Sequence, residues 1–98
     1  TKAESFKLYK DGITVSEIAK ARSLSVATIE GHLAFFVEKG IIDVNEFVSE
    51  EKVKAIEPVL KEIGTGSLAA VKQRLGPEIS FGDIRFVLAW TKRKFSEH

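Results

Sequence analysis

The side chains in this sequence that are best suited to chemistry are the cations and aromatic rings near its end. Arg85, Trp90, Arg93 and Lys94 lie close together on a single predicted helix. Cations bind phosphate groups and aromatic faces stack on unpaired bases, so this combination is typical of contact with nucleic acid. Between residues 66 and 96 the basic side chains outnumber the acidic ones by 4, whereas the whole chain carries only +1. We therefore expect any attraction to a phosphate backbone to come from this local excess.

The sequence offers little for bond-making chemistry. It has no cysteine and two histidines, His32 and His98, which are too few for a metal site. No serine, cysteine or carboxylate partner of His32 can be identified from spacing, and no phosphate-binding loop of the Gly-x-x-x-x-Gly-Lys-Ser/Thr type occurs. We expect this chain by itself to be no enzyme and to hold no metal or cofactor.

Helices must position the basic and aromatic residues. Glycines at positions 12, 40, 64 and 76 follow amphipathic stretches, and residues of the capping type precede such stretches. The pattern predicts helices at residues 2–11, 15–22, 26–39, 50–63, 67–75 and 81–95, with a helical turn at 44–48. Pro58 predicts that the fourth helix is kinked or divided into two short helices, with a break near Glu57. No alternating run is long enough for a convincing strand, so the predicted fold class is all-α.

Residues 12–33 have the form of a helix-turn-helix, with a short helix, a tight turn at 23–25 and a longer helix. Ser25 is placed to cap the longer helix, whose first turn is left exposed with amides that favour phosphate. Leu24 is predicted to fill the turn. The inward residues that we expect to hold the two helices together are Ile18, Ala19, Val26, Ile29, Leu33, Phe36 and Val37.

The outward face of the longer helix has few groups that read base edges. Direct readout relies mainly on arginine, lysine, asparagine and glutamine, so we expect no sequence-specific contact in the major groove. His32, beside the core stripe, is predicted to be mainly a packing or hydrogen-bonding residue. Gly31 is predicted to mark close approach by a neighbouring helix or a DNA backbone. With Leu33 inward, the outward residues are Ala27, Thr28, Gly31, Phe35 and Glu38.

The last helix leaves two interpretations open. Leu88 is taken as its inward residue. Phe86, Trp90 and Arg93 then fall on the opposite side, where a surface helix is normally polar. Either the two rings pack against the first half of the chain, on Phe35, and close one six-helix core, or stacked bases or a partner protein cover them.

Length and composition fit a small globular unit. The 98 residues are 44% hydrophobic and 30% charged, and no run approaches the ~20 apolar residues of a membrane-spanning helix. We divide the chain into two small tri-helical units of helix-turn-helix type, residues 1–48 and 49–98, packed as one domain. Because the chain begins at Thr1 and lacks methionine, we expect it to be a piece of a longer protein.

Two resemblances to known families follow from these strings. Elements at residues 16–19 and 25–32 resemble the DNA-binding region of LuxR-type regulators, over about a quarter of the chain. A second resemblance spans nearly the whole chain, which is similar to the C-terminal helix-turn-helix domain of bacterial RecQ-family ATP-dependent DNA helicases. It is carried by Lys-Asp-Gly at 10–12, Ser-Glu-Ile-Ala-Lys-Ala-Arg at 16–22, Thr-Ile-Glu-Gly-His-Leu at 28–33 and Glu-Ile-Ser-Phe-Gly-Asp-Ile-Arg at 78–85.

The RecQ resemblance implies a parent protein that uses ATP and Mg²⁺ to unwind DNA in recombination and repair, in the bacterial cytoplasm at the nucleoid. This chain would be an accessory tail that binds DNA without sequence readout, or docks onto the helicase core or a partner. The alternatives are a protein-interaction module and the DNA-binding domain of a LuxR-like regulator. The candidate nucleic-acid contacts are Arg22, Thr28, His32, Lys72, Arg74, Arg85, Trp90, Arg93 and Lys94.

Overall fold

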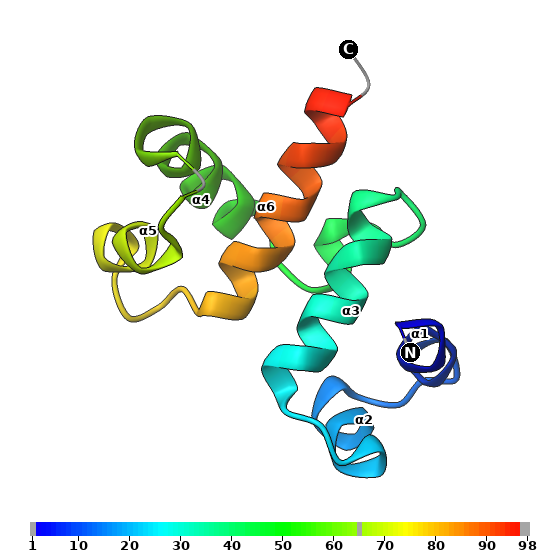
Figure 1. Ribbon diagram of the computed structural model, residues 1–98. Coiled ribbons are helices and arrows are strands. Elements are labelled where there is room, and N and C mark those ends of the chain that lie inside the picture. Colours follow the sequence, from blue (N-terminus) through cyan, green and yellow to red (C-terminus); the bar gives the residue numbers. More distant parts are fainter. Residues whose placement is uncertain (1, 65, 97–98) are drawn as a thin grey trace.

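The computed structural model describes residues 2–64 and 66–96, and all regular structure in these residues is helical (Figure 1). The prediction of an all-α fold is confirmed, and the helices lie close to their predicted places. The division into units 1–48 and 49–98 stays a prediction. The elements are α1 (Lys2–Lys10), α2 (Val15–Arg22), α3 (Val26–Glu38), the 3-10 turn η1 (Val44–Glu46), α4 (Glu50–Ile63), α5 (Leu68–Leu75) and α6 (Phe81–Ser96).

Local signals decide where the helices begin. Thr14 and Glu17 form a reciprocal capping box at α2: the Glu17 amide donates to Thr14 Oγ1 (3.2 Å), and the Glu17 carboxylate accepts from the Thr14 amide (3.4 Å). Ser80 and Asp83 exchange the same two bonds at α6, at 3.1 and 3.2 Å. Ser25 caps α3 as predicted. These starting points can be predicted because each depends on atoms only three residues apart.

Pro58 does not divide the fourth helix. α4 is one continuous helix, so the predicted break near Glu57 is wrong. Pro58 has no amide hydrogen for the carbonyl of Lys54, one turn earlier. Both residues are exposed, so water can solvate that carbonyl. Burial of apolar side chains on both sides of the proline holds the helix together.

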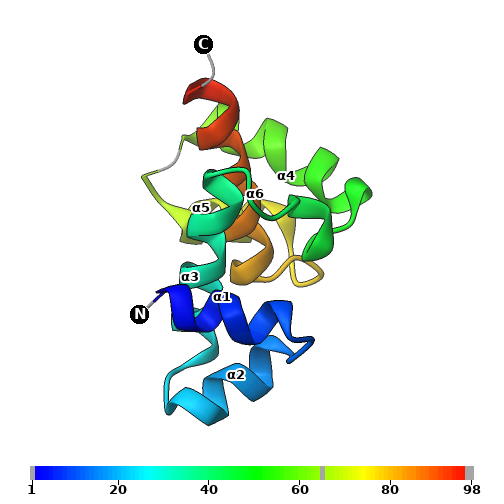
Figure 2. The ribbon, with the colours of Figure 1, turned by 90° about the vertical axis from the view of Figure 1, so that its right-hand side faces the viewer.

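α3 and α6 form the centre of the molecule and pack against each other (Figures 1 and 2). α1 and α2 pack on α3, whereas α4 and α5 pack on α6. Ile29 and Leu33 of α3 and Ile84 and Val87 of α6 are fully buried, in one cluster that also includes side chains from α2, α4 and α5. The two halves of the chain therefore share a single hydrophobic core.

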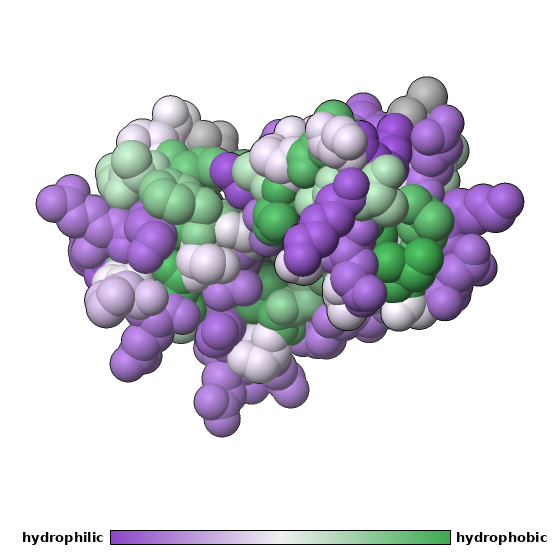
Figure 3. All heavy atoms as spheres, turned by 90° about the horizontal axis from the view of Figure 1, so that it is seen from below, coloured by the Kyte–Doolittle hydropathy of each residue, from purple (hydrophilic) through white to green (hydrophobic). Residues whose placement is uncertain are grey.

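Two apolar residues that were predicted to be inside lie at the surface. Leu24 and Val26 are 38% and 45% exposed, so the predictions that Leu24 fills the turn and that Val26 joins the inward stripe are wrong. The turn that carries them is at one end of the described structure, where none of the labelled helices covers it (Figure 1). Seen from that end, apolar areas lie between projecting hydrophilic side chains (Figure 3).

The aromatic residues of α6 pack inward. Phe86 is 3% exposed and stacks on Phe47, with ring centroids 4.1 Å apart. Trp90 is half-buried against the core. α6 is central and buried on more than one face. Leu88 packs against the core, but Phe86 is buried as well, so the prediction that Phe86 falls on an outer side is wrong. The interpretation of Phe86 as a core residue is correct, but its partner is Phe47 rather than Phe35.

Candidate nucleic-acid interface

The turn between α2 and α3 presents polar atoms at an exposed helix end. Ser23, with φ 55°, adopts the left-handed conformation that ends α2. Ser25 Oγ accepts the Thr28 amide at 3.1 Å and lies 2.8 Å from Thr28 Oγ1. The amides of Val26 and Ala27, both exposed residues, have no acceptor within the helix geometry. This end of α3 is therefore suited to bind an anion such as phosphate.

Arg22 and His32 belong to a network that fastens α1 to the helix-turn-helix. Arg22 Nη1 donates to Ser5 Oγ at 2.6 Å, and that hydroxyl lies 2.8 Å from His32 Nδ1. Arg22 Nη2 also pairs with Glu4 at 3.3 Å. Burial lowers the pKa of His32, and the Arg22 guanidinium lowers it further. The structure gives these two candidate contacts a structural role, whereas Thr28 stays on the surface.

Three of the candidate cations in the second half pair with carboxylates. None of these carboxylates lies within residues 66–96, where the positive excess was counted. These carboxylates offset part of the local excess of 4 that was counted along the chain. The pairs are Arg74 with Glu62 (3.0 Å), Arg85 with Glu30 (3.4 Å) and Lys94 with Glu57 (2.8 Å).

The other candidate contacts of the second half lie against backbone or rings. Lys72 Nζ donates to a backbone carbonyl oxygen just after α5 at 3.3 Å. The Lys94 ammonium group lies 4.3 Å from the centroid of the Trp90 ring. The guanidinium group of Arg93 packs against Gly40, where a side-chain methyl group would overlap it. The candidate contacts are thus distributed over α2, α3, α5 and α6, where Arg22 contacts His32 and Lys94 contacts Trp90.

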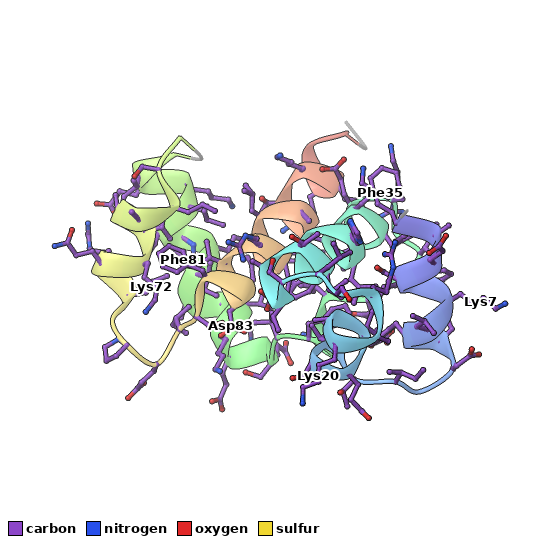
Figure 4. The ribbon with its side chains drawn as sticks, turned by 60° about the horizontal axis from the view of Figure 1, so that its bottom comes forward. Lys7, Lys20, Phe35, Lys72, Phe81 and Asp83 are labelled. Atoms are coloured by element: carbon purple, nitrogen blue, oxygen red, sulfur yellow. The ribbon has the colours of Figure 1, made fainter. Side chains whose placement is uncertain are left out.

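An exposed aromatic residue outside the set of candidate contacts lies on the outward face of α3 (Figure 4). Phe35 is 36% exposed, and the ammonium groups of Lys2 and Lys39 lie 4.4 and 5.4 Å from its ring centroid. Lys2 begins α1, so no spacing along the chain reveals its contact with Phe35. The predicted place of Phe35 on the outward face was the only signal for this cluster.

A shallow groove of about 240 Å³ runs between α3 and α6 beside Phe35. Gly31 lies in the groove, and a methyl group added there would meet nothing within 4 Å. The predicted approach of a neighbouring helix at Gly31 is therefore wrong. A DNA backbone, the second half of that prediction, has room there. The groove is lined by Lys2, Gly31, Ala34, Phe35, Glu38, Arg85, Leu88, Ala89 and Lys92.

α2 and α3 are joined by an exposed turn, α3 is capped at its start, and α1 packs against both helices. These features define a helix-turn-helix domain. A family model described as "Helix-turn-helix domain" matches residues 1–88, and the chain belongs to this family. No solved structure matches the chain.

One relative among curated proteins is Protein YpbB of Bacillus subtilis (strain 168). The two sequences are 27% identical over 86 residues. The aligned segment is 87% of this chain but only 24% of the relative, so the chain spans about a quarter of that protein's length. The relative therefore carries a domain similar to this chain together with much additional sequence.

A helix-turn-helix domain works by binding, and DNA is the partner associated with this class. Within residues 2–64 and 66–96, no three histidine, cysteine or acidic side chains gather where they could hold a metal ion. None of the described helices is long and apolar enough to span a membrane. The groups that this surface offers are backbone amides, hydroxyls, ammonium groups and an exposed ring.

Proposed function

We propose that this chain is the accessory C-terminal helix-turn-helix domain of a RecQ-like ATP-dependent DNA helicase, and that it binds DNA without reading the sequence. The ATP and Mg²⁺ that such a motor needs would bind elsewhere in the parent protein. A parent of this kind acts on the bacterial nucleoid in recombination and repair. The domain would add affinity or orientation to a motor that lies outside it.

The observation that carries the DNA-binding proposal is the exposed face of α3. Ala27, Thr28 and Gly31 are exposed there, and only Thr28 among them has a side chain able to form hydrogen bonds. Such a face cannot distinguish base pairs by the usual bidentate contacts. The amides and hydroxyls at the start of α3 suit phosphate groups instead, which every DNA sequence presents. Binding should therefore depend on the backbone rather than on the order of bases.

Ion pairs limit what the last helix adds to such binding. Arg85 and Lys94 must exchange a carboxylate for a phosphate before they can contact DNA. The exposed Lys94–Glu57 pair contributes roughly 0–1 kcal/mol, so its exchange is not costly. The Arg85–Glu30 pair is part-buried, so breaking it costs more. The Lys94 side chain is 46% exposed and that of Arg85 is 32% exposed, so we expect Lys94 to exchange more readily.

Two of the four strings that carry the RecQ resemblance meet in the fold. Glu30 belongs to the string at 28–33, and Gly82 and Arg85 belong to the string at 78–85. Glu30 Oε1 lies 3.4 Å from Arg85 Nη1, and the same carboxylate packs against Gly82, where a methyl group would overlap it. Burial raises the pKa of Glu30, and the Arg85 charge opposes this shift. The strings therefore describe one contact between α3 and α6, which supports a shared fold.

The coding sequence that flanks this chain tests the proposed parent. A helicase core with a phosphate-binding loop upstream would support the assignment. An unrelated upstream domain would overturn it and leave only the membership of the helix-turn-helix family.

Electrophoretic mobility shifts at graded salt test the DNA role. We expect similar affinities for unrelated sequences and a marked loss of binding between about 50 and 200 mM salt. Thr28→Glu should weaken binding, because it places a negative charge where phosphate would bind while suiting the start of a helix. Ala69→Glu, in the exposed first turn of α5, is the matched control.

Two outcomes of this titration would contradict the proposal. Absence of any complex near 50 mM salt would remove the DNA role. A preference of about 1000-fold for one sequence would indicate a LuxR-like regulator instead.

A second candidate function, docking onto a protein, is favoured by one observation. A depression of about 440 Å³ lies between α6 and residues 40–46, and it includes Trp90 and the 54% exposed Ile41. Apolar groups exposed in a depression are typical of contact with a partner protein. A dimer or complex that is lost on Ile41→Glu and Trp90→Glu, with DNA affinity unchanged, would favour docking; light scattering after size exclusion measures it.

A further inference from the structure

We propose that the Phe35 patch, which comprises Lys2, Gly31, Phe35, Lys39 and Lys92, is a stacking site for single-stranded DNA. An unpaired base would lie on the Phe35 ring, and its flanking phosphates would contact the three lysines. The inference rests on the proposed DNA-binding function and adds to it the class of nucleic acid and the site. The sequence indicated base stacking on the aromatic residues of the last helix. The structure favours the outward face of α3 instead.

Phe35 has the properties of a base platform. Its ring is exposed, and its neighbour Phe36 supports it in an edge-to-face contact, with centroids 5.3 Å apart. Phe36 itself stacks on Phe6 of α1, so the platform is fixed to the core. Stacking on such rings is tolerant of sequence, because every base has an aromatic face.

The charges around Phe35 favour a nucleic acid over an apolar partner. Lys2 from α1 and Lys39 from the end of α3 place ammonium groups near the ring, and Lys92 of α6 lines the groove beside it. Three separate elements thus supply positive charge around one aromatic side chain. A base on the ring would take the place of an ammonium group, which could then contact the adjacent phosphates.

Gly31 supplies room for the strand. A glycine in the middle of a helix lowers helix stability relative to alanine. Gly31 does not have the positive φ that would require glycine, and a methyl group there would meet nothing within 4 Å. The fold therefore gives no reason for this glycine. It lies one turn before Phe35, so a strand stacked on the ring can pass close to the helix backbone at Gly31.

Glu38 sets one limit of the proposed path. It lines the groove and is half-buried, so its carboxylate would repel a phosphate placed next to it. A duplex offers no unpaired base to the ring and must bring two charged backbones to the same narrow face. The patch therefore suits one strand better than two.

Fluorescence anisotropy with a labelled thymidine oligonucleotide of about 12 nucleotides tests the site, with a duplex of equal length as comparison. We expect the 98-residue chain to bind the single strand more tightly than the duplex. Phe35→Ala should reduce single-strand affinity about tenfold or more. The matched control is Phe81→Ala, because Phe81 is also exposed (42%) and has an ammonium group, of Lys72, 5.9 Å from its ring centroid.

Two further variants separate a contact with the strand from an effect on folding. Gly31→Ala adds a methyl group in open space and should weaken single-strand binding several-fold with no loss of helicity by circular dichroism. Glu38→Gln should strengthen binding, because it removes the one carboxylate that lines the groove.

The outcomes distinguish the stacking site from the broader DNA role. If the wild-type chain binds DNA and Phe35→Ala and Gly31→Ala bind the single strand as tightly as it does, the stacking site is overturned and the proposed function stands. If Phe81→Ala weakens binding as much as Phe35→Ala, the site is equally overturned. If the wild-type chain binds neither the strand nor the duplex, the proposed function and the site fail together.

Discussion

The sequence indicates that α6 offers aromatic and cationic groups to a ligand and that the outer face of α3 does not. In the structure, the outer face of α3 carries the exposed ring, and α6 is largely buried. α6 is rich in cations and aromatic residues, yet Phe86 is buried on Phe47 and Arg85 is paired with Glu30. The outer face of α3 is nearly neutral, yet Phe35 is exposed there between Lys2 of α1 and Lys39 at the end of α3. The residues offered to a ligand are therefore those that the fold leaves uncovered.

This difference shows that the charge available to a ligand depends on the neighbours of each side chain in the fold, and not on the net charge of one helix. α6 lies at the centre and is covered by α3, α4 and α5, so its cations Arg85 and Lys94 meet Glu30 of α3 and Glu57 of α4. α3 is covered on the sides that face α1, α2 and α6, and Lys2 of α1 and Lys92 of α6 line the groove at its remaining face. Long lysine side chains can reach such a face from a distance.

The largest expected effect is on the free energy of unfolding, and it distinguishes Phe86 from Phe35. Phe86→Ala should lower the free energy of unfolding by about 3–5 kcal/mol, because it opens a cavity in the shared core. Phe35→Ala should lower it by about 1 kcal/mol or less, because that ring is partly exposed. Urea denaturation followed by circular dichroism measures both. Equal losses would break the comparison, since they would mean that Phe35 is as much a core residue as Phe86.

The next largest expected effect is at the contact between Gly40, which follows α3, and Arg93 of α6. Gly40 has φ 77° and faces the Arg93 guanidinium group. Gly40→Ala should cost about 1–2 kcal/mol, because a side chain disfavours this backbone conformation and displaces Arg93. Thermal denaturation measures the loss. An unchanged melting temperature would show that the end of α3 is not tied to α6 through this contact.

Gly31→Ala should have a smaller effect of opposite sign. Alanine in an exposed helix interior is favoured over glycine by up to about 1 kcal/mol, and nothing in the fold obstructs the added methyl group. We expect a higher urea midpoint for this variant. A lower midpoint would mean that Gly31 serves the fold, and the argument that it makes room for a DNA strand would lose its basis.

The smallest effect is a pH dependence that arises from His32. Its pKa is lowered in the folded chain, whereas the unfolded chain keeps the ordinary value of 6.5. The unfolded state therefore takes up a proton first as pH falls through 6.5, and stability decreases from there down to the lowered pKa. Above pH 6.5 this contribution is constant.

Urea midpoints at pH 7.5, 6.5 and 5.5 measure the decrease. His32→Asn should flatten the dependence, and the same change at the other histidine, His98, serves as the control. A slope that persists in His32→Asn would assign the pH dependence to another group.

Much of the fold could be predicted because its signals are local. Ser25, Thr14 and the glycine that follows each of several helices act on backbone atoms within a few residues, so helix ends follow from the sequence. The break predicted at Pro58 did not occur, because burial of apolar side chains on the other face of α4 keeps the helix continuous. The burial predicted for Leu24 and Val26 was wrong, because a sequence pattern does not show whether another element covers the turn.

The candidate site could be predicted only in part. The exposure of Thr28 could be predicted because it follows from helical periodicity, and its contact with DNA stays a prediction. Arg22 and His32 have the residue types of a DNA contact, but the buried Ser5 of α1 draws them inward. The cluster around Phe35 was missed because Lys2 reaches it across more than thirty residues of sequence.

The amino-acid sequence by itself determined the all-α class, the helix-turn-helix and most helix boundaries, because capping and periodicity act over one or two turns. Only the tertiary structure decided which cations are neutralised, which aromatic residues are buried and where an exposed ring meets positive charge. Coulomb attraction and burial act through space, between segments that the order of residues does not bring together.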